Sequence, residues 1–239
     1  MEEQNSSRVR VAVMQPYVFP YMGYFSLVSK VDHFIFLDDA SFRKKGWINR
    51  NVLIINGSPM LFTVPLIGQS QNRAINEINT SGLTDFAKKF RKTVAMKYGK
   101  YPYFQNISEI ISACFPEHDT KISKIAIESV VQISRYLGLG TKFSIASEDF
   151  RNDGLSGAER IIDICIRAGA RTYINAEGGR ALYKTDEFLS RGVSLEFDMY
   201  SERQCSSFFK TEGHVVSSID ALMRFSPDQI RTELNDEIP

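Results

Sequence analysis

Polar side chains that could bind or transform a ligand gather at three places, and each place directly follows a short apolar run. The first run, residues 8–14, is followed by Gln15, Tyr17 and Tyr21. The second, 33–39, ends in Asp38 and Asp39 and leads to Lys44, Trp47, Asn49, Arg50 and Asn51. The third, 171–174, precedes Asn175, Gly178, Gly179 and Tyr183. If the runs are parallel strands of one sheet, these groups share the rim where open α/β sheets bind ligands.

The residue types at this rim favour a ligand with rings and anionic groups. An aromatic face with a fixed fork of donors, as in Trp47 and Arg50, suits a nucleotide base, sugar or phosphate. Gly178-Gly179 before a helix could bring backbone N–H groups to a phosphate. Each feature also has a structural interpretation: Arg50 stacked on Trp47 to seal a hairpin, and a plain glycine turn. The tyrosines of the first loop could equally be packed on its prolines, Pro16 and Pro20.

Asp38 and Asp39 do not form an obvious pair of catalytic carboxylates. Adjacent side chains on a strand face opposite ways, so the two act together only if the strand has already ended. A lone Asp next to Lys44 or Arg50 is more often part of a structural ion pair than a general base.

The cysteines and histidines predict neither a disulfide framework nor a metal site. The three cysteines lack CxxC spacing, and Cys165 lies in an apolar helical run. Cys114 is near His118 and Cys205 is nine residues before His214, but a nucleophilic pair requires contact in the fold. No cluster has the ligand spacing of zinc or iron sites. We therefore expect a site without metal or cofactor.

Composition narrows the class of protein. The 239 residues include 29 Lys and Arg against 28 Asp and Glu, a net charge of +1, which argues against a nucleic-acid partner. No stretch is long and apolar enough to span a bilayer, and the first residues lack the apolar core of a signal peptide. We expect a cytoplasmic protein with no membrane insertion. The oligomeric state cannot be read from the sequence.

Periodicity predicts an α/β fold: a mostly parallel sheet with flanking helices, a β-hairpin and a helical insertion. We expect a single domain over residues 9–239, with the insertion at about 83–140 and a flexible N-terminus at 1–8. The expected strands are 8–14, 33–39, 142–147, 171–174 and 193–200, with a hairpin of 51–56 and 60–66 around a turn at Gly57-Ser58. Residues 67–82 read as a loop. The expected helices are 24–31, 84–99, 101–115, 121–139, 154–169, 181–192, 218–225 and 227–234. Strand order does not follow from these patterns.

Several of these segments resemble the WbqC-like protein family. The resemblance rests on MQPYVFPYMGYF (14–25), FLDDASFRKKGWINRN (36–51), LFTVPL (61–66) and YINAEGGRALY (173–183). It runs from about residue 9 to about 225, with a loose fit over 201–216. One departure is Ser41, where many relatives carry Gln after the acidic pair.

The resemblance implies a setting in bacterial surface-glycan biosynthesis of the O-antigen or lipopolysaccharide type. It suggests a transferase that forms an amide on a nucleotide-linked amino sugar, with acyl-CoA or an acyl-carrier protein as donor. In this interpretation Asp39 is the general base or orients the amine, and Gln15, Asn49 and Asn51 donate hydrogen bonds. Lys44 and Arg50 hold phosphate, Trp47 stacks on a ring, and the loop from Asn175 to Gly179 closes the other side.

Two alternatives stay open. The first alternative is nucleotidyl transfer. The loop after residues 8–14 also resembles that of nucleotidylyltransferases of the HxGH type, but Tyr21 and Tyr24 stand where those enzymes use histidines. The second alternative is a non-catalytic protein that binds a nucleotide sugar or glycan as the partner of another enzyme, since no nucleophile is evident.

Overall fold

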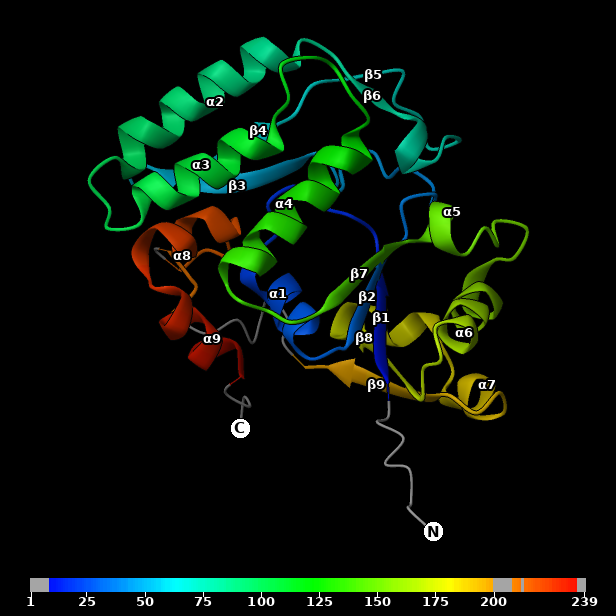
Figure 1. Ribbon diagram of the computed structural model, residues 1–239. Coiled ribbons are helices and arrows are strands. Elements are labelled where there is room, and N and C mark those ends of the chain that lie inside the picture. Colours follow the sequence, from blue (N-terminus) through cyan, green and yellow to red (C-terminus); the bar gives the residue numbers. More distant parts are fainter. Residues whose placement is uncertain (1–8, 200–207, 212, 236–239) are drawn as a thin grey trace.

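The protein is built on a five-stranded sheet in which every strand is parallel to its neighbours (Figure 1). The computed structural model describes residues 9–199, 208–211 and 213–235. The strands lie in the order β7 (Lys142–Ile145), β2 (His33–Phe36), β1 (Arg10–Met14), β8 (Thr172–Ala176) and β9 (Ser194–Asp198). The predicted α/β fold with a parallel sheet, a hairpin and flanking helices is confirmed.

Strands β1 and β2 are apolar after their first residues, Arg10 and His33, because both faces of the sheet are covered. Phe34 and Phe36 of β2 pack in the larger of two hydrophobic cores, while Ile35 between them packs in the smaller core on the opposite face. Val11 and Val13 of β1 also point to the smaller core. Because side chains alternate along a strand, each strand packs against helices on both faces of the sheet.

The helices divide between these two faces. The larger core holds residues of α1 (Met22–Ser29), α4 (Ile122–Tyr136), α8 (Ser218–Arg224) and α9 (Pro227–Asn235). The smaller core holds residues of α5 (Ala146–Asp149), α6 (Gly157–Arg167) and α7 (Thr185–Leu189). In Figure 1 these two groups flank the sheet on opposite sides.

A hairpin and the helices α2 and α3 lie beyond the carboxyl ends of the strands (Figure 1). The hairpin pairs β3 (Arg50–Ile55) with β4 (Ser58–Thr63). Its turn is Asn56-Gly57, one residue earlier than predicted, and both residues have positive φ (49° and 78°), as in a type I′ turn. The helical stretch consists of α2 (Leu83–Tyr98), α3 (Phe104–Cys114) and α4.

The segment predicted as loop, 67–82, contains short regular elements. It includes part of β5 (Leu66–Ile67), the 3₁₀ helix η1 (Ile75–Glu77) and β6 (Asn79–Thr80). The Asp119 carboxylate accepts hydrogen bonds from the backbone N–H groups of Gly82 and Leu83, at 3.2 and 3.0 Å. Hydrogen bonds to the charged form lower the pKa of Asp119, and they satisfy donors at the start of α2.

Strand order changes direction between β1 and β8, and this is the feature of the fold that matters most for function. The chain runs from β1 through α1 to β2 on one side, and later from β7 through α6 to β8 on the other. Open α/β sheets bind ligands in the crevice at such a switch point, outside the carboxyl ends of the strands.

Across the described ranges, no helix combines the length and apolar character needed to cross a bilayer.

Candidate functional site

A cavity of about 380 Å³ opens at the switch point between β1 and β8. We call it the switch-point cleft. It is lined by the carboxyl ends of both strands, the turn after β2, the start of α6, and the 3₁₀ helix η2 (Glu177–Leu182) with the residue after it. Its polar lining residues are Gln15, Tyr17, Arg43, Asn175 and Tyr183, together with Gly178 and Gly179. The structure thus brings two of the three predicted segments to one cavity.

Gln15 and Asn175 face this cleft from neighbouring strands. The Gln15 carbonyl accepts a hydrogen bond of 3.0 Å from the buried Tyr24 hydroxyl, which fixes the backbone where β1 ends. The side-chain amide of Gln15 makes no hydrogen bond to the residues that the structure describes. Asn175 Oδ1 accepts from the backbone N–H of Ala176 at 2.9 Å. Its Nδ2 is left without a partner over the same described ranges, so both amides have groups to offer a ligand.

Gly178 and Gly179 lie in η2 directly after β8, not in a plain loop. A Cβ atom on residue 179 would lie 2.1 Å from Asn175 Nδ2, whereas one on residue 178 would meet nothing within 4 Å. A side chain at residue 179 would therefore displace the Asn175 amide. The conformation of the Asn175 amide and the start of η2 depend on each other.

The phenols of the cleft are neutral hydrogen-bonding groups at physiological pH. Burial raises the pKa of Tyr17, and the nearby Arg43 guanidinium acts weakly in the opposite direction. Burial also raises the pKa of Tyr183, and the neighbouring Tyr173 acts in the opposite direction. Neither phenol is poised as a base at pH 7, so both would bind a substrate as uncharged partners.

A second cavity, of about 310 Å³, adjoins the first. We call it the loop pocket; it is lined by residues 43–48 together with Gln15 and Tyr17. The predicted ligands Lys44 and Trp47 line it, and Gln15, Tyr17 and Arg43 line both cavities. A third hollow, of about 40 Å³, is lined by Tyr21 and Asn51 with Tyr17 and Trp47. The predicted residues of the first loop and of 44–51 therefore meet around Tyr17.

Arg50 holds the backbone of the 43–48 loop. Its Nε donates to the Gly46 carbonyl at 2.9 Å, and its Nη2 donates to the Lys45 carbonyl. Its guanidinium carbon lies 5.7 Å from the centre of the Trp47 ring, in a cation–π contact. The sequence left two roles open for Arg50, ligand binding and a structural contact with Trp47. In the structure Arg50 makes the structural contact.

Asn49 and Asn51 are also used within the protein. Asn49 Nδ2 donates to the Val64 carbonyl at 2.8 Å. Asn51 Nδ2 donates to the Phe19 carbonyl at 2.8 Å, and its Oδ1 accepts from Val52 N. These bonds attach the start of the hairpin to its surroundings, and they position the first loop beside the site.

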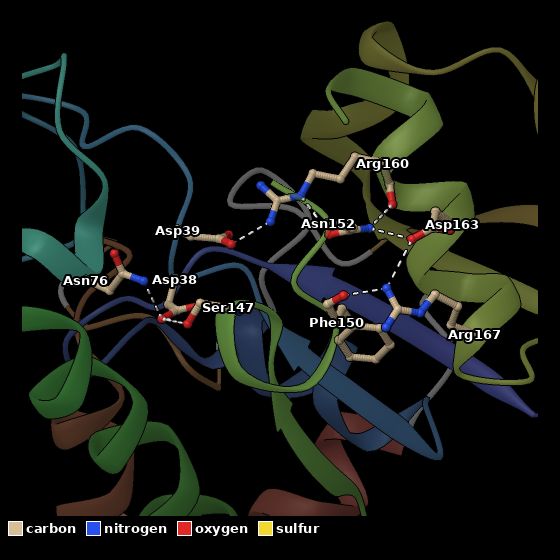
Figure 2. A network of polar contacts seen from close by, with 9 residues as sticks. All are labelled: Asp38, Asp39, Asn76, Ser147, Phe150, Asn152, Arg160, Asp163 and Arg167. Atoms are coloured by element: carbon tan, nitrogen blue, oxygen red, sulfur yellow. Dashed lines mark hydrogen bonds and ion pairs between the residues drawn. The ribbon is translucent and has the colours of Figure 1, made fainter. Parts of the chain in front are cut away.

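Asp38 and Asp39 point to different partners, although β2 has ended before them (Figure 2). Asp38 accepts from the Asn76 amide at 3.0 Å and from the Ser147 hydroxyl at 2.7 Å. The Ser147 backbone N–H also donates to it at 3.1 Å. Asp38 therefore joins the ends of β2 and β7 to η1, and it lines none of the three cavities described.

Asp39 forms an ion pair with Arg160 of α6, with 2.6 Å between Asp39 Oδ2 and Arg160 Nη2 (Figure 2). Both side chains are only about a tenth exposed, at 11% and 10%. Asp39 Oδ1 is buried and has no hydrogen-bond partner among the described residues. Asp39 lies outside the lining of all three cavities, so the structure brings Gln15 and Asn175 together but not Asp39 and Arg50.

The Asp39–Arg160 pair continues into a polar network along α6. Arg160 Nε donates to Asn152 Oδ1 at 3.0 Å, and Asn152 Nδ2 donates to Asp163 at 2.8 Å. Arg167 then pairs with Asp163 at 3.5 Å. Figure 2 shows this chain of contacts running from the turn after β2 along α6 to Arg167 at its C-terminal end.

Sequence reasoning missed Arg43 and Arg160. Arg43 stands in the run Arg43-Lys44-Lys45, and that run of cations after the second strand was a signal for it. Arg160 lies 121 residues from Asp39 in an amphipathic helix, and no spacing rule connects the two.

Neither described cysteine is placed to act as a nucleophile. Cys114 and Cys165 are buried and line no described cavity. Burial raises the pKa of the Cys165 thiol to about 12 and raises that of Cys114 as well, so both stay protonated at neutral pH. Cys205, the 1–8 terminus and residues 201–207 and 212 of the segment 201–216 lie outside the described residues.

Comparison with known proteins places these features in a family. The model of the WbqC-like protein family matches residues 15–232, which include all three of the predicted segments. The chain belongs to the WbqC-like protein family. This WbqC-like chain is also similar to the uncharacterized protein Rv1507c of Mycobacterium tuberculosis (strain ATCC 25618 / H37Rv). The two are 27% identical over 231 residues, which cover 93% of this chain and 97% of the relative. No solved structure matches it.

Proposed function

We propose that this WbqC-like protein binds a nucleotide-linked amino sugar in the switch-point cleft and transfers an acyl group to the sugar's amine. The observation that carries the proposal is the placement of Gln15 and Asn175, whose side-chain amides offer uncommitted groups to one cavity. The cavity lies where open α/β sheets bind nucleotides. Amides, neutral phenols and one guanidinium suit the hydroxyls and phosphates of such a ligand. The family's setting in surface-glycan biosynthesis favours an amino sugar.

The proposed step joins the sugar nitrogen to an acyl carbon. The ammonium first loses a proton, and the free amine attacks the carbonyl carbon of an acyl-CoA or acyl-carrier-protein thioester. The C–N bond forms and the C–S bond breaks. Of the two protons that the nitrogen loses, one leaves with the thiol and one is released. The step requires positioning and a proton acceptor, not a protein nucleophile. It therefore suits a cleft whose described lining holds no serine, cysteine or histidine.

Asp39 is the carboxylate that we assign to the amine. Its Oδ2 is held by Arg160, and its buried Oδ1 has no partner among the described residues. An unpaired buried acceptor costs about 1–3 kcal/mol, so an ammonium donor at Oδ1 would be bound favourably. Because Asp39 is not a lining residue and its Oδ1 is buried, the proposal requires the sugar to extend to the turn after β2 and the side chains that cover Oδ1 to move aside.

The test is mass spectrometry of UDP- and dTDP-linked amino sugars incubated with the protein and each donor class. We expect an amino sugar to gain the acyl mass as free thiol is released. Gln15→Ala and Asn175→Ala should each lower kcat/KM about 10-fold or more, since each removes hydrogen bonds to substrate. Gln71→Ala is the matched control, because this exposed amide lines none of the described cavities and should leave the rate unchanged.

Two other outcomes would replace the proposal. If no amino sugar gains mass with either donor while nucleotide sugars still bind, the protein is a binding partner of another enzyme. If Mg²⁺, a nucleoside triphosphate and a sugar phosphate instead yield pyrophosphate, the activity is nucleotidyl transfer. The buried Tyr24, whose hydroxyl donates to the Gln15 carbonyl, does not favour that second reaction.

A further inference from the structure

The loop pocket contains a group of cations that nothing else in the described structure neutralises. Arg43, Lys44 and Lys45 are consecutive, exposed and line one cavity. None of them forms an ion pair with an acidic residue in the described ranges. By contrast, Arg160 pairs with Asp39 at 2.6 Å (Nη2 to Oδ2). Arg224 pairs with Asp220 at 2.9 Å (Nε to Oδ2). Three like charges side by side repel one another, which an anionic ligand would relieve.

The loop that carries these cations is fixed at both ends. The buried Phe42 donates its backbone N–H to the Arg73 carbonyl at 2.8 Å, and the carbonyl of the buried Ile48 accepts from Val18 N at 3.1 Å. Between them, Arg50 binds the carbonyls of Lys45 and Gly46.

The backbone of the loop leaves little room for change. Lys45 has a positive φ of 61°, and a Cβ on residue 46 would lie 3.0 Å from the Arg43 carbonyl oxygen. A loop already held in one conformation loses less entropy when it binds a ligand. The cations are therefore presented on a rigid support.

The two cavities are continuous through shared residues. Gln15, Tyr17 and Arg43 line both the switch-point cleft and the loop pocket. The lining of the switch-point cleft contains one charged side chain, Arg43, at the side that it shares with the loop pocket. A ligand with one uncharged part and one strongly anionic part would match this division.

We propose that the loop pocket binds the diphosphate of a nucleotide-type ligand while an uncharged part of the same ligand occupies the switch-point cleft. Arg43 and Lys44 would contact the phosphate oxygens, with Arg43 placed at the boundary of the two cavities. The inference rests on the proposed nucleotide-linked substrate but not on acyl transfer. Both a nucleotide sugar and CoA carry this diphosphate, so the experiment includes both.

The experiment is isothermal titration of wild type and Arg43→Ala/Lys44→Ala with UDP, dTDP, CoA, inorganic pyrophosphate and the nucleosides uridine and thymidine. We expect the double variant to lose about 10- to 100-fold in affinity for the diphosphate ligands, as two charge-assisted hydrogen-bonding groups are removed. Nucleoside affinity should stay the same. Loss for UDP or dTDP alone assigns the pocket to the sugar nucleotide, and loss for CoA alone assigns it to the donor.

The matched control removes two charges from another surface. Lys88→Ala/Lys89→Ala on the exposed side of α2 should change diphosphate affinity less than about 2-fold, because separate exposed charges are screened. Wild-type affinity for UDP should also fall with rising salt, while uridine affinity should not.

The inference is overturned if wild type binds none of the diphosphates, if the double variant binds them as tightly as wild type, or if nucleosides are lost to the same extent. If diphosphate binding behaves as expected and no acyl transfer occurs, the proposed reaction fails and the subsite stands.

Discussion

The Asn175 amide and Gly179 are in such close contact that residue 179 has no space for a side chain while the amide keeps its position. The Nδ2 atom would lie 2.1 Å from a Cβ at this position, well inside any van der Waals contact. Asn175 ends up 5% exposed at the carboxyl end of β8, with its amide against the first turn of η2. The geometry of the cleft on this side is therefore set by a glycine.

Gly179→Ala should impair ligand binding without unfolding the protein. The added methyl group must displace the Asn175 amide, so we expect UDP or dTDP affinity to fall about 10-fold or more, as for a lost hydrogen bond and a steric change together. Titration calorimetry measures this. Gly140→Ala is the matched control, since this exposed glycine lines none of the described cavities and a Cβ there meets nothing within 4 Å; affinity should stay unchanged. Equal affinities for the two variants would show that the Asn175 position does not matter for binding.

The buried Asp39–Arg160 pair makes a prediction about stability. Arg160→Met removes one partner and leaves a carboxylate that is only about a tenth exposed without its cation. We expect a loss of about 3–5 kcal/mol in the free energy of unfolding, measured by urea denaturation. Glu196→Gln breaks the exposed contact with Arg10, where the side chains are 53% and 45% exposed, and should cost less than about 1 kcal/mol. Similar losses in both variants would contradict the buried character of the first pair.

The same pair changes how an Asp39 variant must be tested for catalysis. Asp39→Asn keeps the shape but leaves the Arg160 guanidinium uncompensated, so the variant loses stability as well as any proton acceptor. Asp39→Asn/Arg160→Gln removes both charges. If Asp39 accepts the proton, turnover should fall about 10²- to 10⁴-fold in the double variant while sugar-nucleotide affinity is kept. An Arg160→Gln variant that turns over as slowly as the double variant would assign the effect to the disrupted pair.

The first loop is held in a strained conformation that three hydrogen bonds secure. Phe19 is fully buried with a positive φ of 42°. Its N–H donates to Ser129 Oγ at 3.0 Å, and its carbonyl accepts from Asn51 Nδ2 and Ser217 Oγ, each at 2.8 Å. Asn51→Ala should lower the free energy of unfolding by about 1–3 kcal/mol, because buried groups lose a partner. Asn72→Ala, at an exposed amide, is the control and should stay within about 0.5 kcal/mol.

His33 predicts how stability depends on pH. Burial lowers its pKa, and the charge of Lys142 adds to the effect while Asp149 opposes it. Because the unfolded chain takes up a proton at about pH 6.5 and the folded chain only at lower pH, stability should fall as pH drops below about 6.5. Thermal unfolding between pH 5 and 7.5 should show a shallower slope for His33→Gln than for wild type. His214→Gln, at an exposed histidine, should keep the wild-type slope.

Local patterns in the sequence were sufficient to predict the strands of the main sheet, the hairpin and the longer helices, but not the short elements β5, η1, β6, α5 and η2. Buried parallel strands are continuous apolar runs, so a strand was predicted at 33–39, of which 33–36 forms β2. The Pro227 start of α9 followed from the preference of proline for the first helical turn. The hairpin turn was placed one residue late because Asn56, like Gly57, tolerates a positive φ. Strand order could not be predicted, since the long connection from β2 to β7 gives no signal of which edge it reaches.

In the candidate site, only residues that directly follow a strand of the sheet could be predicted to line the cleft. Gln15 and Asn175 could be identified because residues directly after parallel strands meet at one rim. Residue types alone could not show which polar side chains form hydrogen bonds within the protein and which face a cavity. Arg50 binds its own loop, and Asp38 binds Ser147 109 residues away, through contacts that exist only once the chain has folded.

A crystal structure of the protein with a UDP- or dTDP-linked amino sugar tests the central claim most directly. We expect the nucleotide sugar between the carboxyl ends of β1 and β8, with hydrogen bonds to the Gln15 and Asn175 amides and the diphosphate against Arg43 and Lys44. The sugar amine should lie within hydrogen-bonding distance of Asp39 Oδ1. A ligand bound on another face of the molecule, with the switch-point cleft empty, would contradict the account.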